Sequence, residues 1–226
     1  EKIGIVTYLS PDTDIVTSTT SPTSSPTKTP TGSTLFTLTL TDAEDLEIRE
    51  ANPSSTSRGN RASITVDRSD GGGKTQGLLK FPSLNLPSDY TIVSATLTIV
   101  SNNPTSSSGV ISGYRMIQNW VETGTNWNSF ADEDVGVATD DIEASDTESF
   151  TVDSPNNTGT KTIDVLNDVR AWVNDGVPNQ GWMFENSSTN GFDFYSKDEG
   201  DANLRPKLVI EYYAGPTEPP SPSNIF

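Results

Sequence analysis

Apolar and polar residues alternate along most of residues 35–213, which is the pattern of β-strands with one buried face. The clearest example is Ile92–Val100, where Val93, Ala95, Leu97 and Ile99 are predicted to share one face. Shorter runs, separated by Gly, Pro, Asn and Asp, predict strands at residues 35–40, 46–50, 63–68, 77–81, 110–117, 150–152, 161–163, 181–185, 192–196 and 207–213.

One segment, residues 165–174, has a helical pattern instead, and Asp164 precedes it as a candidate N-cap. Its apolar residues recur at helical spacing: Val165, Val169, Trp172 and Val173. The acidic stretch Asp132–Thr147 is predicted to be a loop. Many short strands with one short helix predict an all-β fold, a single jelly-roll-like β-sandwich.

The chain divides into four segments by composition. Residues 34–213 form the predicted sandwich, and residues 214–226 are a Pro-rich tail. Residues 10–33 are a tether made mostly of Ser, Thr and Pro, with the regular spacing Pro22, Pro26, Pro30. Such a tether is extended and spans on the order of 70 Å at about 3 Å per residue. It separates residues 1–9 from the sandwich, and its hydroxyls are candidates for O-glycosylation.

The segment Lys2–Leu9 has the pattern of one isolated strand. Two rows of side chains alternate along it, Ile3, Ile5, Thr7 and Leu9 on one side and Gly4, Val6 and Tyr8 on the other. A single strand has no partners for its backbone groups, so it returns to its own domain, pairs with another molecule or stays disordered. We favour addition to a neighbouring copy, which predicts a subunit of a pilus-like extracellular filament, a head-to-tail homopolymer.

Composition excludes several other functions. The net charge is −17 and the basic residues are scattered, which argues against nucleic acid as a partner. The chain has neither His nor Cys, so Ser–His–Asp and Cys–His catalysis are impossible, and we expect no enzymatic activity. No apolar run is long enough to cross a membrane as a helix. The chain starts at Glu1 instead of Met, which is typical of a mature exported protein, so an extracellular location is expected.

Two kinds of modification or ligand site are expected. Carboxylates are hard oxygen ligands that suit calcium, and the best candidates are Asp45, Glu47, Asp198, Glu199 and Asp201. A solvated acidic loop is the alternative explanation for these residues. The sequons at Asn156 and Asn186 are candidates for N-glycosylation.

Four segments together resemble the DNRLRE-type domain, a secreted β-sandwich module related to carbohydrate-binding modules. They are residues 77–99 (GLLKFPSLNLPSDYTIVSATLTI), 120–128 (WVETGTNWN), 163–184 (IDVLNDVRAWVNDGVPNQGWMF) and 196–213 (SKDEGDANLRPKLVIEYY). The resemblance covers about residues 45–213. It implies a jelly roll, export and, in some members, binding of polysaccharide including alginate, without catalysis.

This resemblance supports a second function, a secreted carbohydrate-binding or adhesin module. The family positions that the four tryptophans match imply that these side chains are buried in the core and do not form a sugar-stacking surface. The tryptophans are Trp120, Trp127, Trp172 and Trp182. The remaining aromatic candidates for sugar contact are Tyr90, Tyr114 and Tyr195. A net charge of −17 would repel an acidic polymer such as alginate unless calcium bridged the two.

Overall fold

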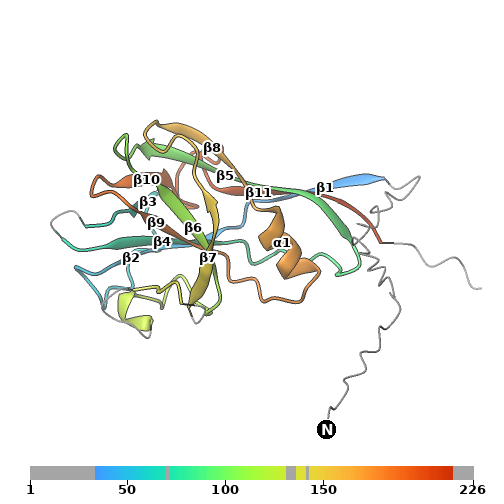
Figure 1. Ribbon diagram of the computed structural model, residues 1–226, viewed down its shortest axis with the longest axis horizontal. Helices are drawn as coiled ribbons and strands as arrows, with labels where there is room; N and C mark the ends of the chain where they lie inside the picture. Colours follow the sequence, from blue (N-terminus) through green and yellow to red (C-terminus); the bar gives the residue numbers. More distant parts are fainter. Residues whose placement is uncertain (1–33, 70–71, 131–135, 141–142, 216–226) are drawn as a thin grey trace, which may run out of the picture. The chain divides into compact units, whose positions relative to one another are not determined.

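A computed structural model describes residues 34–69, 72–130, 136–140 and 143–215. These residues form two antiparallel sheets packed face to face with one short α-helix, which confirms the predicted all-β sandwich (Figure 1). The N-terminal strand, the tether and residues 216–226 of the tail lie outside the described residues.

The first sheet has six strands in the order β1-β11-β5-β10-β3, and β8 pairs with the other side of β5. Its strands are β1 (Leu35–Leu40), β3 (Ser63–Val66), β5 (Thr91–Asn103), β8 (Gly159–Asp164), β10 (Phe192–Tyr195) and β11 (Lys207–Tyr213). The second sheet has the order β2-β4-β9-β6-β7. Its strands are β2 (Glu44–Arg49), β4 (Thr75–Lys80), β6 (Ile111–Met116), β7 (Ala144–Thr151) and β9 (Trp182–Asn186).

The main core lies between the sheets, where large side chains from both inner faces pack with α1 (Leu166–Val173). A second apolar cluster covers the outer face of the five-stranded sheet. It is supplied by the β6–β7 connection, whose Trp120, Trp127 and Phe130 pack over Leu46 and Leu78. All four tryptophans are buried, which confirms their prediction as core residues.

Two local details differ from the sequence prediction. Val93 is 38% exposed, because the β5–β11 register shifts between Glu211 and Tyr212 and turns Ile92 into the core instead. The helix has Val165 at its N-cap, and Asp164 accepts a hydrogen bond from the Leu166 N–H at 2.9 Å. Each difference is a shift of one residue within an element that the pattern predicted.

A larger difference concerns the acidic stretch Asp132–Thr147. The sequence predicts a loop there, but β7 already begins at Ala144. Residues Asp146, Thr147 and Glu148 are exposed on this strand, whereas Ala144 and Phe150 are buried. An edge strand with one solvated side tolerates charged residues. The acidic composition therefore predicts a loop where the chain forms a strand.

Candidate functional site

A groove on the outer face of the five-stranded sheet combines an aromatic ring with several polar groups. Tyr114 of β6 is half-buried there and packs against the outer apolar cluster. The groove has a volume of about 270 Å³ and is lined by Arg68, Ser112, Tyr114, Glu185, Asn186 and Ser187. A ring beside convergent hydrogen-bonding groups is typical of a small-ligand site.

The charges around this groove nearly balance. Glu185 forms an ion pair with Lys74, and the Arg68 guanidinium donates to the Ser187 carbonyl at 3.4 Å. Glu148 of β7 lies opposite Tyr114. Burial raises the pKa of the Tyr114 hydroxyl, and Glu185 and Glu148 raise it further. The phenol therefore stays neutral at ordinary pH and is available as a hydrogen-bond donor.

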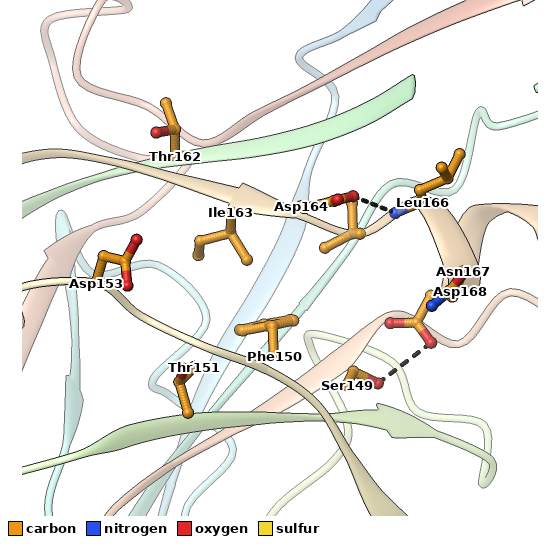
Figure 2. Close-up of a pocket in the computed structure, with 11 residues that line it drawn as sticks. Ser149, Phe150, Thr151, Asp153, Thr162, Ile163, Asp164, Leu166, Asn167 and Asp168 are labelled. Atoms are coloured by element: carbon orange, nitrogen blue, oxygen red, sulfur yellow. Dashed lines mark hydrogen bonds between the residues drawn. The ribbon is translucent and has the colours of Figure 1, made fainter. Parts of the chain in front are cut away.

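A larger cleft, about 410 Å³ in volume, separates β7 from β8 at one open side of the sandwich. Figure 2 shows Phe150 and Ile163 between the two strands, with the hydroxyls of Ser149, Thr151 and Thr162 around them. Three carboxylates also line it, those of Asp153, Asp164 and Asp168.

Two of these three carboxylates already serve the fold. Asp168 is buried and accepts hydrogen bonds from Trp182 Nε1 at 2.7 Å and from Ser149 Oγ at 3.2 Å. Asp164 accepts from the first turn of the helix. The ring of Phe150 is only 8% exposed, so the cleft presents no open aromatic face. In the Tyr114 groove, by contrast, an aromatic ring lies beside several polar groups.

The predicted calcium ligands separate into a cluster and three scattered residues. Asp45 and Asp198 come together with Glu122, and one oxygen of each lies within 4.8 Å of the others. Oxygens at this spacing match the ligand type of calcium. Glu122 is absent from the predicted set, although it lies in the 120–128 segment of the family resemblance.

An ammonium group already neutralises part of this cluster. Lys197 Nζ lies 3.1 Å from Glu122 and 3.2 Å from Asp198, and the Lys197 backbone N–H donates to Asp45 at 2.7 Å. Burial raises the pKa of Asp45 to about 7. Burial also raises the pKa of Glu122, against the lowering effect of Lys197. A calcium ion here would displace the Lys197 ammonium.

The other three predicted ligands have different partners. Glu47 is bound by Arg49 at 2.6 Å and Arg58 at 2.7 Å. Glu199 accepts a hydrogen bond from the backbone of Asp201, and Asp201 accepts two from Asn203. These contacts stabilise the fold locally and bring none of the three into the cluster.

A comparison with known families supplies the identity that geometry alone does not. Residues 37–212, well over half of the chain, match carbohydrate-binding module family 96. The chain belongs to this family. The match lies within the segment 34–213 that composition delimits as the sandwich. No curated protein sequence matches the chain. No helix among the described residues is long and apolar enough to cross a membrane.

For a member of family 96, the placement of open aromatic rings is informative. The three predicted tyrosines are all half-buried. Tyr90 stacks on Tyr212 at 5.3 Å between ring centroids, and Tyr212 stacks on Phe36 at 5.7 Å. Tyr212 therefore lies between two stacked rings, and Phe36 at one end of this row is 44% exposed. Tyr195 lies on β10, where the neighbouring Phe194 points into the core and Tyr195 to the opposite face.

The two predicted glycosylation sites differ in access. Asn156 is exposed in the turn between β7 and β8. Asn186 is 1% exposed, and its amide donates to the carbonyls of Val66 and Asn190, each at 3.1 Å. A glycan on Asn186 would require this buried amide to leave its partners, so only Asn156 remains a practical candidate.

Proposed function

We propose that this chain is a secreted, non-catalytic module that binds a glycan in the groove beside Tyr114. The family match supports carbohydrate binding in general. The groove supports the location, because it joins a half-buried ring with a guanidinium, a carboxylate and hydroxyls. Sugars have apolar faces that pack on aromatic rings and hydroxyls that exchange hydrogen bonds with planar polar groups.

The charge distribution favours a neutral polysaccharide. Arg68 and Lys74 are balanced locally by Glu185 and Glu148, and the whole chain carries −17. A polymer of uronic acids would meet long-range repulsion that the groove does not offset. The volume of about 270 Å³ is at the small end for ligand pockets, which predicts contact with a short stretch of the polymer and weak affinity per module.

Depletion of the chain from solution by a panel of insoluble and immobilised polysaccharides tests this proposal. The panel includes neutral glucans and galactans, alginate, and a partly deacetylated chitin. Tyr114→Ala should weaken binding to the preferred polymer about tenfold, because loss of ring contact and its burial is worth about 1.4 kcal/mol. Arg68→Ala should have a smaller effect on the same polymer.

Tyr195→Ala is the matched control, since Tyr195 is also half-buried but lies on the other sheet. It should bind as the unmodified chain does. If Tyr195→Ala abolishes binding and Tyr114→Ala does not, the groove is the wrong site. If no member of the panel binds, the proposal of a neutral glycan fails as well.

We also propose that copies of the chain assemble head to tail into an extracellular filament, with Lys2–Leu9 as the connecting strand. One observation favours this second function: the sandwich has a long apolar edge strand, β1, whose outer side has no partner strand among the described residues. Sedimentation and negative-stain microscopy of the purified chain over a range of concentrations would show the polymer. A chain lacking residues 1–9 should remain monomeric.

A further inference from the structure

Strand β1 is an edge strand without the features that usually protect such edges. It pairs with β11 through all six residues, Leu35 to Leu40, in unbroken register, and within the described part of the chain it has a partner strand on one side only. Its sequence, LFTLTL, contains no charge, no Pro and no Gly. Natural edge strands are commonly blunted by charges, bulges, short length or a covering segment, because unpaired backbone groups attract other strands.

Each other edge strand of the described residues has such protection. β2 carries four charged residues, Glu44, Asp45, Glu47 and Arg49. β7 carries Asp146 and Glu148 and pairs with β6 through two register shifts. β8 carries Lys161 and Asp164.

The remaining edge, β3, is protected differently. It has only four residues, and its Thr65 N–H donates to the carboxylate of Glu47 at 2.9 Å. β1 therefore differs from these edges in having six residues with no charge, no register shift and no covering group among the described residues.

The side chains on β1 also favour a partner. Leu35 and Phe36 are 45% and 44% exposed. Phe36 is one end of the stacked row that continues through Tyr212 to Tyr90, and the ring face of Phe36 away from Tyr212 looks toward the free edge. Figure 1 shows β1 at one end of the sandwich beside β11. A strand added to β1 would cover both the backbone edge and this ring.

The sequence offers one matching strand. Lys2–Leu9 is mostly apolar, has no acidic residue and presents two alternating rows of side chains. It is two residues longer than β1, which has six. The tether from Ser10 to Ser33 contains three regularly spaced prolines, which favours an extended chain. An extended tether is long enough for the strand to reach β1 of a neighbouring copy.

We propose that the free edge of β1 is the acceptor for Lys2–Leu9 of a second copy. This inference rests on the proposed filament assembly and adds to it the surface and the partner. The added strand forms a backbone ladder with β1. Tyr8, in the row of Gly4 and Val6, is the side chain suited to extend the aromatic row by packing against Phe36.

Two variants of the whole chain separate donor from acceptor. In Thr37→Lys/Thr39→Lys, two lysines are placed on exposed positions of β1, so the edge is blocked while Lys2–Leu9 is intact. In Val6→Pro, the connecting strand loses a backbone N–H donor and can no longer pair as a regular strand, while β1 is intact. Each variant alone should be monomeric, with at least a tenfold loss of polymer in sedimentation. An equimolar mixture should give a dimer that contains one of each.

Thr160→Lys/Thr162→Lys is the matched control, with the same change on the edge strand β8, where both residues are also exposed. It should polymerise like the unmodified chain. Polymerisation that survives the β1 lysines would overturn the acceptor assignment but leave the filament proposal standing. An unmodified chain that stays monomeric at every concentration would overturn both proposals. If the mixture of the two variants gives no dimer, strand pairing between copies is wrong.

Discussion

The two six-residue edge strands β1 and β2 meet the same physical problem in opposite ways. Both have one side without a strand partner among the described residues. In β2 the four central residues are buried, and the carboxylates of Asp45 and Glu47 are bound by groups from other segments. In β1 only Leu40 is buried, and no charged residue is present.

This difference shows how a sandwich can close one edge and leave another open. Asp45 and Glu47 lie opposite Leu79 and Gly77 of β4, so they share the inner face of the sheet. There they accept hydrogen bonds from Lys197, Arg58 and the β3 backbone, which ties β2 to the six-stranded sheet. We therefore expect changes in β2 to alter the stability of the domain, and changes in β1 to alter its association.

The largest effect should come from Glu47→Ala. Its side chain is fully buried between Arg49 and Arg58, so removal leaves a largely buried guanidinium without its counter-charge. Breaking such a pair costs about 3 kcal/mol. For a domain of this size the melting temperature should fall by about 6–12 °C in calorimetry.

Glu44→Ala on the same strand is the control for Glu47→Ala. Glu44 is 36% exposed and pairs with Lys80 at 3.0 Å, and Lys80 keeps its hydrogen bond to the Trp120 carbonyl. This change should cost less than about 1 kcal/mol. If the two variants lose the same stability, buried charge is not what holds the β2 edge.

The next effect is a pH dependence from Asp45. Its pKa is raised by burial from 3.8 to about 7, with Glu122, Asp198 and Lys197 facing it. The folded state therefore holds a proton that the unfolded state releases, so the contribution of Asp45 to stability falls as pH rises from about 4 through 7.

Asp45→Asn removes this dependence. In chelator-treated buffer the variant should melt several degrees above the unmodified chain at pH 8 and at nearly the same temperature at pH 4. The reason is that Asn mimics the protonated carboxyl and still accepts a hydrogen bond from the Lys197 N–H. An advantage that is equal at both pH values would show that the Asp45 carboxyl titrates normally.

Calcium binding at Asp45, Glu122 and Asp198 should have a smaller effect. Because the ion must displace Lys197 Nζ, we expect a dissociation constant in the weak range of extracellular sites, about 10⁻⁴–10⁻³ M. At tenfold excess over that value the stabilisation is about 1.4 kcal/mol, or roughly 3–5 °C in melting temperature. Asp198→Asn should abolish this gain, whereas Asp201→Asn should keep it. An unchanged melting temperature on chelation and calcium addition would exclude the site.

Sequence reasoning predicted the elements of this fold better than the contacts between them. Alternation located β11 and β6, because period is a local property of the chain, whereas the family resemblance implied that the four tryptophans are buried. It failed at Val93, where a bulge at the start of β5 puts Ile92 in the core instead, since a register shift depends on the partner strand; Ala95, Leu97 and Ile99 are buried as predicted. It also failed at the start of β7, where an edge position tolerates charges that otherwise indicate a loop.

The candidate sites were less predictable for the same reason. Tyr114 was one of three tyrosines with no local signal to separate it from the others. Only the antiparallel pairing of β6 with β9 and β7 brings Glu185 and Glu148 beside it. Likewise, Asp45, Glu122 and Asp198 are far apart in sequence and meet only through the fold. Pairing between distant strands is tertiary information that composition does not carry.

The smallest expected effect is the one that most sharpens the contrast between the two edges. Thr37→Lys/Thr39→Lys changes two exposed positions on β1, and Thr37 lies opposite Glu211 of β11, which the new lysine can approach across the strands. The melting temperature of the monomer should therefore change by no more than about 2 °C. A marked loss of stability would mean that β1 is held by interactions along its outer side, and that its edge is closed, like that of β2, within a single copy.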